Sequence, residues 1–354
     1  MLGLVTTPGM AHTTEVAEVR DPSPAPGELL LRTVEVGVCG TDREISEGSF
    51  GVAPGDAERL LLGHELLGVV EEGGHGFERG DLVTATVRRS CGHCQACAQG
   101  SPDACHTGDY FERGITRLDG FASELTAERA EHLVAVPSSL GRLGVLAEPA
   151  SVCARAIRHA RSVGERQPWR TDRALVIGSG AIGMLSTCFL RLDGFEVWVA
   201  GRSTPPTPKS ELAEACGARY VSTNETTLAS LTEETGGFDV VIEAAGDAQV
   251  MLDTLGLLRR NGVACLLGVD GSRRKVELDG PVLGVDTILQ NRALLGSVNA
   301  HARDWEDAVE RLDRARDRWP DALEQFVGLR VPVDRFAEAF GFRGVKATLR
   351  FAAG

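Results

Sequence analysis

The chain has 354 residues, of which 43% are hydrophobic and 25% are charged, and its formal net charge is −13. This length is sufficient for two domains with complete cores, and the composition is ordinary for a soluble globular protein. The acidic charge argues against nucleic-acid or anionic-membrane binding, and no apolar run approaches the roughly 20 residues of a membrane span. There is no secretory signal pattern, and nine cysteines, an odd number, favour a reducing cytoplasm over a disulfide framework.

Two possible metal ligands lie far apart in the first part of the chain. Residues 28–36 alternate between apolar and polar side chains, which predicts a half-buried strand. This strand leads to Cys39, and His64 follows after a loop rich in glycine and proline. A thiolate and an imidazole can begin an open zinc site, but a buried cysteine and a hydrogen-bonded histidine explain the spacing equally well.

Four cysteines further along the chain have a more specific spacing. Cys91, Cys94, Cys97 and Cys105 follow the pattern C-x2-C-x2-C-x7-C. Cysteines this close cannot pair with each other without strain, but they can surround one tetrahedral cation. Four thiolates leave no open coordination position, so the pattern predicts a structural zinc site. An iron–sulfur cluster is the main alternative, and a set of reactive thiols is a weaker one.

The middle of the chain alternates between predicted strands and helices. The strands are predicted at residues 174–177, 196–200, 219–221, 238–244, 263–268 and 293–298. The helices are predicted near residues 181–192, 210–216, 227–234 and 248–259. This order predicts an α/β fold with a parallel sheet and helices on both faces. Further helices are expected at about 147–160 and at 304–318, and a last strand at 347–351 is expected to return to the first domain.

A glycine motif joins the first of these strands to its helix. Gly178, Gly180 and Gly183 have the G-x-G-x-x-G spacing, which permits a tight turn, close approach of the backbone to a pyrophosphate, and close packing of helix on strand. The helix begins with Ala181 and Ile182, whose N–H groups face phosphate oxygens in such motifs. The motif predicts a dinucleotide site, and a glycine-rich turn in another kind of α/β protein is the alternative.

The tip of the second strand in this region bears on the choice of dinucleotide. NAD-binding domains place an acidic residue there, which binds the ribose 2′-hydroxyl group. Residues 200–203 are Ala-Gly-Arg-Ser, so the tip has no carboxylate. Arg202 is instead suited to a 2′-phosphate, to which Ser203 can also donate. We therefore expect NADP, and NAD with Arg202 stacked on the adenine is the alternative.

The order of these motifs carries a family resemblance. The chain has Cys-Gly-Thr-Asp at 39–42, then Gly-His-Glu at 63–65, the four cysteines, Glu148 followed by proline, and the glycine motif. In this order it resembles the zinc-dependent medium-chain alcohol dehydrogenases over essentially its whole length. Within that superfamily it most resembles the glucose dehydrogenase branch, through the segments 86–91, 107–115, 119–121 and 296–299.

The resemblance implies an architecture of two domains. A GroES-like β-barrel catalytic domain would comprise residues 1–155 and 299–354, with a structural zinc lobe at about 88–106. A Rossmann domain with a doubly wound parallel sheet would comprise residues 156–298. The resemblance also implies two zinc ions per chain and assembly as a homodimer or homotetramer.

The resemblance further implies roles for the residues of a catalytic zinc site. Cys39 and His64 match zinc ligands, and Glu65 matches a carboxylate that can enter the coordination shell. Glu148 matches a position that helps to bind the metal or its water, although the sequence by itself is equally consistent with a helix cap. Thr41 matches the hydroxyl that passes a proton away from the substrate, and a turn residue at the end of a strand is its alternative.

The resemblance leaves the substrate open within a class. Glu112, Glu148 and Asn299 match polar positions that contact sugar hydroxyls, and Asn299 also lies near the cofactor in the family. Val87 and Leu289 stand where some glucose enzymes have Asn and His, and the loss of two hydrogen-bonding groups can change specificity strongly. We therefore expect an enzyme that oxidises a sugar, polyol or cyclitol. The alternatives are a threonine-, sorbitol- or secondary-alcohol-type dehydrogenase and, more remotely, a non-catalytic dinucleotide-binding sensor.

Overall fold

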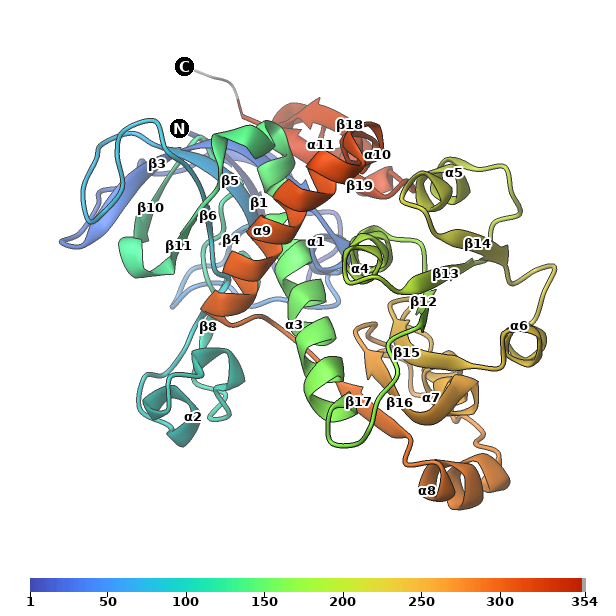
Figure 1. Cartoon of the computed structure of the whole chain (residues 1–354). Coiled ribbons are helices and arrows are strands. Elements are labelled where there is room, and N and C mark those ends of the chain that lie inside the picture. The colour runs from blue at the N-terminus through green and yellow to red at the C-terminus, as the bar shows by residue number, and fades with distance from the viewer. Residues whose placement is uncertain (352–354) are drawn as a thin grey trace. The chain divides into compact units, whose positions relative to one another are not determined.

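The structure is a computed structural model that describes residues 1–351. These residues form two compact units (Figure 1). The first unit comprises Met1–Ser151, Asn299–Asp313 and the chain from Val327 onward, and the second comprises Val152–Val298 and Arg314–Phe326. The resemblance assigned residues 314–326 to the catalytic domain, whereas the structure groups them with the second unit. The reason is that α10 (Pro320–Gln325) contacts α5 (Pro208–Ala215) of that unit.

The first unit is built around a seven-stranded, mostly antiparallel sheet. In sheet order its strands are β11 (Leu133–Ala135), β6 (Leu82–Ala85), β5 (Glu65–Val70), β3 (Glu28–Val38), β19 (Lys346–Arg350) and β18 (Val327–Pro332), with β10 (Leu125–Arg129) also paired to β3. The alternation predicted for residues 28–36 is present, since Leu29 and Leu31 are buried. β19 returns from the end of the chain and pairs antiparallel with β3, as predicted. This pairing brings the start of β19 to the residues that follow β3.

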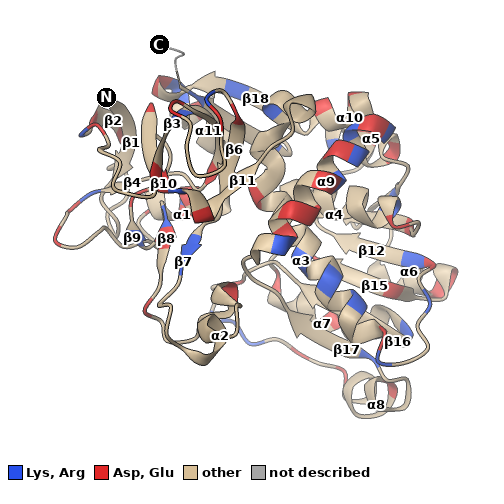
Figure 2. Cartoon of the chain, turned by 60° about the vertical axis from the view of Figure 1, so that its left-hand side comes forward, with Lys and Arg blue, Asp and Glu red and all other residues tan. Residues whose placement is uncertain are grey.

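Smaller elements complete the first unit. A three-stranded sheet contains β1 (Leu2–Thr6), β2 (Glu15–Glu18) and β4 (Leu60–Leu61), and another contains β7 (Arg88–Arg89), β8 (Phe111–Arg113) and β9 (Arg117–Leu118). The helices are α1 (Gly40–Ser46), α2 (Gln95–Ala98) and α11 (Phe336–Gly341), and α3 (Ala147–Gly164) and α9 (Ala302–Arg318) begin in this unit. α9 is amphipathic as predicted: Trp305, Ala308 and Leu312 are buried, and its charged residues are drawn red and blue in Figure 2.

The second unit contains a six-stranded sheet in which every pair is parallel. In sheet order its strands are β14 (Arg219–Ser222), β13 (Glu196–Gly201), β12 (Arg173–Ile177), β15 (Phe238–Glu243), β16 (Leu258–Leu266) and β17 (Ala293–Gly296). Its helices include α4 (Ala181–Leu192), α5, α6 (Leu228–Thr235), α7 (Ala248–Leu257), α8 (Thr287–Leu289) and α10. This strand order is that of a doubly wound nucleotide-binding sheet, so the predicted fold class is confirmed.

One boundary in this sheet differs from the prediction. The helix expected at 248–259 ends at Leu257, and β16 begins directly at Leu258 rather than near residue 263. Asn261, within the early part of the strand, has a left-handed backbone conformation with φ of 65°. A left-handed residue inside a strand is an irregularity that periodicity cannot reveal. Among residues 1–351, no helix combines the length and apolar character needed to span a membrane.

Candidate active site and metal centres

The first candidate centre brings together Cys39, His64 and Glu65. Cys39 follows the end of β3 and caps α1, and its Sγ atom accepts a hydrogen bond of 3.2 Å from Thr41 N. His64 and Glu65 lie at the start of β5, and His64 Nε2 is 3.1 Å from Cys39 Sγ. One donor atom from each of the three residues lies within 4.8 Å of the others. A sulfur, a nitrogen and a carboxylate oxygen at this spacing fit a single zinc ion.

A buried carboxylate, Asp42, supports two of these donors. Its Oδ1 is 3.5 Å from His64 Nδ1, and its Oδ2 accepts a hydrogen bond of 2.9 Å from Cys39 N. A carboxylate behind a ligand histidine orients the ring so that the other nitrogen faces the metal. No role for Asp42 was predicted from the sequence, although its position three residues after a helix-capping Cys39 is a capping-box signal.

Lys346 is a second residue that sequence reasoning missed. Its Nζ lies 2.5 Å from the Glu65 carboxylate and 3.2 Å from Val38 O, and it is only 2% exposed. Lys346 and Glu65 are 281 residues apart, so only the pairing of β19 with β3 brings them together. Gly37 makes room for this pair, because a Cβ atom there would lie 1.8 Å from Glu65 Oε2. The charge of the buried Glu65 carboxylate is therefore balanced within the protein.

Glu148, in the first turn of α3, lies near this centre but outside the group of three donors. Burial and the neighbouring Glu65 carboxylate raise the pKa of Glu148 to about 7. Burial lowers the pKa of His64, but the charges of Cys39 and Asp42 outweigh this and raise it well above its usual value. The raised pKa of His64 reflects an excess of negative charge, which a bound cation would compensate, whereas burial is the largest cause of the raised pKa of Glu148. Thr41 is half-buried beside Cys39.

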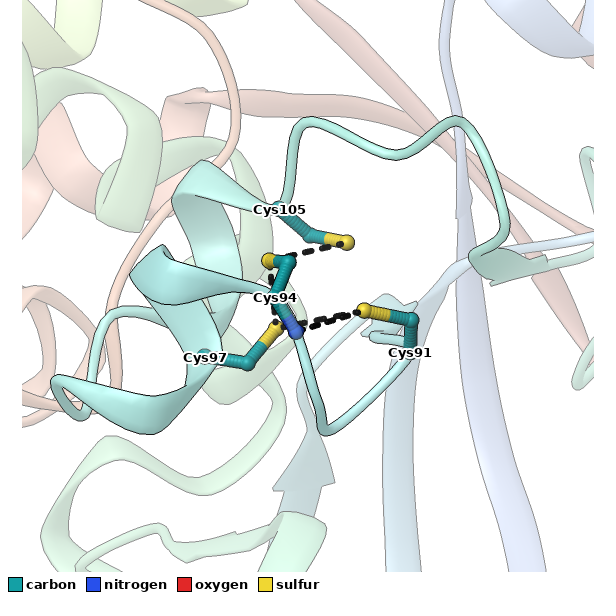
Figure 3. Close-up of side chains that lie close together, drawn as sticks. All are labelled: Cys91, Cys94, Cys97 and Cys105. Atoms are coloured by element: carbon teal, nitrogen blue, oxygen red, sulfur yellow. Dashed lines mark hydrogen bonds between the residues drawn. The ribbon is translucent and has the colours of Figure 1, made fainter.

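The second candidate centre is the four-cysteine cluster in the lobe that follows β7 (Figure 3). The sulfur atoms of Cys94 and Cys97 are 3.4 Å apart, those of Cys91 and Cys97 are 3.8 Å apart, and those of Cys94 and Cys105 are 4.0 Å apart. A tetrahedral zinc ion with bonds of about 2.3 Å places its sulfur ligands about 3.8 Å apart. An iron–sulfur cluster, which has several irons and sulfides between its thiolates, needs a wider spacing.

The lobe favours the thiolate form of two of its ligands, since hydrogen bonds lower the pKa of Cys91 and Cys105. For Cys97, the hydrogen bond from Ser90 lowers the pKa, but burial and the hydrogen bonds with Cys94 and Cys91 outweigh it and raise the pKa. Burial raises the pKa of Cys91, but hydrogen bonds from the His93 backbone and the Thr107 hydroxyl outweigh this and lower it to about 6. Metal ligation requires the thiolate, so these hydrogen bonds assist binding. All nine cysteines of the chain are free thiols in the structure.

The glycine motif forms an open cradle at the end of β12. Gly178 has φ of 107°, and a Cβ atom there would lie 2.8 Å from the Ala244 carbonyl carbon. A Cβ atom at Gly183 would lie 1.9 Å from Gly178 O, so the helix packs on the turn as closely as expected. Gly180 caps α4, which begins Ala181-Ile182, and nothing lies within 4 Å of its Cβ position. The first-turn N–H groups of α4 lack intrahelical acceptors, so the cradle fits a pyrophosphate.

The tip of β13 carries no acidic side chain. β13 ends at Gly201, and the exposed residues Arg202 and Ser203 follow it. Asn224 Nδ2 donates a hydrogen bond of 2.6 Å to Arg202 O, which holds the backbone at this point. The guanidinium group of Arg202 can therefore meet a phosphate group without competition from a neighbouring carboxylate on the strand tip.

The predicted substrate residues lie in two different settings. Glu112, on β8, is paired with Arg88 on β7, whose Nη2 is 2.9 Å from Glu112 Oε1. Asn299 has a left-handed backbone with φ of 64°, and its Oδ1 accepts a hydrogen bond of 2.9 Å from Ala300 N. Among the described residues, no group accepts a hydrogen bond from the buried Asn299 Nδ2. A buried amide without a partner is costly, which makes Asn299 Nδ2 a candidate ligand contact.

Val87 and Leu289, which stand where some glucose enzymes have Asn and His, also differ in their surroundings. Val87 is 6% exposed in the first unit, and its carbonyl accepts a hydrogen bond from Arg113 N. Leu289 is 64% exposed at the end of α8 in the second unit. Neither side chain offers a hydrogen bond to a sugar.

Two protein families match the chain, and together they cover most of it. Residues 25–138 match the alcohol dehydrogenase GroES-like domain, and residues 141–350 match the family described as glucose dehydrogenase C-terminus. Glucose 1-dehydrogenase of Methanocella arvoryzae is 39% identical over 97% of this chain and 96% of its own. Glucose 1-dehydrogenase of Halobacterium salinarum is 38% identical over 96% of both chains.

A solved structure agrees with this assignment over the whole chain. Haloferax mediterranei glucose dehydrogenase in complex with NADP, Zn and gluconolactone has a TM-score of 0.92, 32% identity, and coverage of 100% of both chains. The sequence matches thus indicate the same family as three features of the structure: the fold, the two cysteine-containing centres and the glycine cradle. The chain belongs to the glucose dehydrogenase branch of the zinc-dependent medium-chain alcohol dehydrogenases.

Proposed function

We propose that this chain is an NADP-dependent sugar dehydrogenase that oxidises the anomeric alcohol of glucose or a closely related aldose to the lactone. The observation that carries the proposal is the convergence of Cys39, His64 and Glu65 on one point, with donor atoms within 4.8 Å of each other. The relatives named glucose 1-dehydrogenase, and a related structure that holds NADP, Zn and gluconolactone, support the sugar and the cofactor.

Within this proposal, zinc would polarise the C1 hydroxyl of the sugar, and NADP would accept the hydride that leaves C1. Cys39 and His64 would hold the metal, and the Asp42 carboxylate, 3.5 Å from His64 Nδ1, would favour the ring orientation in which Nε2 is the ligand. Thr41, beside Cys39, receives the hydroxyl proton of the sugar and passes it to solvent. The reaction balances, because the sugar loses the C1 hydrogen as a hydride and the C1 hydroxyl hydrogen as a proton, which leaves the lactone.

Glu65 and Glu148 have different roles in this proposal. Lys346 balances the charge of Glu65 at 2.5 Å, which keeps this carboxylate available as an alternative metal ligand without leaving an uncompensated buried charge. Glu148 lies outside the group of three donors and is half-buried, so we assign it to the metal-bound water or to a sugar hydroxyl. Glu112 and Asn299 would bind further sugar hydroxyls, and the family resemblance also makes Asn299 a candidate cofactor contact.

The second unit binds the dinucleotide in this proposal. Gly178, Gly180 and the first turn of α4 with Ala181, Ile182 and Gly183 hold the pyrophosphate, which agrees with the open space at Gly180. Arg202 and Ser203 bind the 2′-phosphate of NADP, since the tip of β13 carries no acid to accept a hydrogen bond from a ribose 2′-hydroxyl.

An initial-rate panel tests the proposal. The zinc-loaded protein is assayed with NADP and with NAD against glucose, galactose, xylose, inositols, sorbitol and threonine, and reduced nicotinamide is followed by its absorbance. We expect aldoses with NADP to have the highest kcat/KM. Turnover confined to sorbitol, threonine or a cyclitol would instead mean that Val87 and Leu289 mark a changed substrate pocket. Cofactor binding without turnover of any alcohol would favour the sensor alternative.

We also propose that the chain forms a homo-oligomer through its second unit. β17 is an edge strand of the parallel sheet, and apolar side chains near it are exposed, among them Ile288 at 66% and Val298 at 68%. An unpaired edge flanked by apolar surface suits pairing with a second copy. Analytical ultracentrifugation should show a dimer or tetramer. None of the nine cysteines forms a disulfide in the structure, which suits a reducing compartment such as the cytoplasm.

A further inference from the structure

One short segment of the four-cysteine lobe (residues 91–105) contacts side chains from the rest of the first unit: residues 100–103. This segment lies between the third and fourth cysteines of the cluster, Cys97 and Cys105. Two carbonyl groups in it, those of Gly100 and Asp103, accept hydrogen bonds from side chains outside the lobe. The segment therefore lies between two candidate metal ligands, and donors from elsewhere in the first unit bind its first and last residues.

The first donor is Arg88, on β7. Both residues of β7 are arginines, so this strand is drawn blue in Figure 2. Arg88 Nη1 donates to Asp103 O at 2.9 Å, while Nε and Nη2 approach Glu112 Oε1 at 3.0 and 2.9 Å. The guanidinium also lies 4.0 Å from the centre of the Tyr110 ring, and it is only 11% exposed. One planar group thus links the lobe to the carboxylate proposed to bind sugar.

The second donor is His301, which precedes α9. His301 Nδ1 accepts a hydrogen bond of 3.2 Å from Arg303 N, so Nε2 carries the proton and donates to Gly100 O at 2.7 Å. His301 N donates to Asp304 Oδ2 at 3.0 Å, which fixes the backbone of the same turn. Asn299 lies two residues earlier, in a left-handed conformation that needs support from its surroundings.

We propose that the lobe positions the sugar site: Arg88 and His301 are positioning residues that connect segment 100–103, between the candidate metal ligands Cys97 and Cys105, to Glu112 and Asn299. The inference rests on the proposed function, because it takes these two residues as the sugar contacts. Both side chains that donate to the lobe are neighbours of proposed sugar contacts: Arg88 pairs with Glu112, and His301 lies two residues after Asn299. A lobe that served stability alone would not require this arrangement. In this proposal the lobe determines the positions of the two side chains, Glu112 and Asn299, that bind the sugar hydroxyls.

The test compares Arg88→Met and His301→Ala with matched controls. Arg129→Met removes an exposed arginine paired with Glu131, and His106→Ala removes an exposed histidine from the lobe itself. Each purified protein is assayed for zinc content, thermal unfolding, kcat, and KM for the sugar and for NADP. We expect KM for the sugar to rise about 10-fold in Arg88→Met and about 5-fold in His301→Ala, in proportion to the hydrogen bonds lost. KM for NADP should change less than about twofold, and the controls should behave like the parent protein.

Two further variants connect the effect to its route. Arg88→Lys retains a positive charge beside Glu112 but loses the planar fork, so its KM for the sugar should lie between those of the parent and Arg88→Met. Arg88→Met should raise KM for the sugar far less in a Glu112→Gln background than in the parent protein. The reason is that a positioning residue acts only through the group that it holds. If Arg88→Met does not fold, Arg88→Lys and His301→Ala carry the test.

The outcomes separate this inference from the proposed function. The inference is overturned if Arg88→Met and His301→Ala leave KM for the sugar within twofold of the parent, or if they raise both Michaelis constants equally. It is also overturned if the effect of Arg88→Met is additive with that of Glu112→Gln. If Glu112→Gln and Asn299→Ala themselves have no effect on an active enzyme, the proposed sugar contacts are wrong. If no sugar is turned over at all, the proposed function is wrong.

Discussion

The two candidate metal centres differ in how the chain supplies their ligands. The lobe cluster takes all four of its cysteines from residues 91–105, whereas the active-site centre combines residues that follow β3 and begin β5, with a buried lysine from β19 beside them. The local centre needs only a short loop to close around an ion. The dispersed centre exists only after the sheet of the first unit has formed, so its geometry depends on the whole unit.

The largest expected effect is a loss of turnover when a ligand of the active-site centre is removed, while the lobe keeps its metal. Cys39→Ser should lower turnover by about 10³-fold or more, because it removes a ligand from the site that activates the alcohol. The lobe should remain loaded, so mass spectrometry of the metal content should find one zinc per chain. Thermal unfolding should change little. Full activity in this variant would show that the chemistry does not depend on the Cys39 centre.

Removing a lobe ligand should act on stability instead. Cys105→Ser breaks the cage of four thiolates, and we expect the first unit to lose about 4 kcal/mol of its free energy of unfolding. Urea titration followed by circular dichroism measures this loss, and an otherwise identical titration with added chelator should bring the parent protein to the same midpoint. A Cys105→Ser variant as stable as the parent would mean that the cluster binds no structural ion.

The buried ion pair of the dispersed centre should have the next largest effect. Lys346→Met leaves the Glu65 carboxylate buried without its cation, and we expect a loss of about 3 kcal/mol in the free energy of unfolding. The double variant Glu65→Gln with Lys346→Met removes both charges and should recover most of that stability. These variants are compared by urea unfolding of the metal-free proteins. Simple additivity of the two changes would contradict a direct pairing of these residues.

The smallest expected effect lies in the second unit, away from both metal centres. Arg202→Ala should raise the dissociation constant for NADPH about 10-fold, as the loss of one charged hydrogen-bonding group predicts. NADH should bind the variant and the parent equally, because it has no 2′-phosphate. Quenching of protein fluorescence gives both constants without turnover. An equal loss for NADPH and NADH would mean that Arg202 contacts the adenine.

Some features could be predicted from sequence because their causes are local. The spacing of Cys91, Cys94, Cys97 and Cys105 already limits which metal geometry they can adopt, and the structure places their sulfurs within reach of one ion. The strands of the second unit were predicted because buried parallel strands are continuous apolar runs. The start of β16 was predicted too late, since the left-handed Asn261 interrupts its pattern.

Other features follow from pairings between distant segments. The resemblance suggested Cys39, His64, Glu65 and Glu148 as one site, yet only the structure shows that Glu148 lies outside the group of three close donors. Nothing near Lys346 in the sequence indicates an active-site neighbour, because its partner is 281 residues away. The same holds for His301, whose contact with Gly100 joins segments 201 residues apart.

The sequence by itself determined the elements whose interactions are short-range: the thiolate cage, the glycine turn with its helix, and the order of strands and helices. Tertiary structure decided which charges meet. Lys346 reaches Glu65 through the pairing of β19 with β3, and Arg88 reaches Glu112 through the register of β7 with β8. The physical reason is that hydrophobic patterns specify which face of an element is buried, whereas the partner of a buried charge depends on strand pairing between segments far apart in the chain.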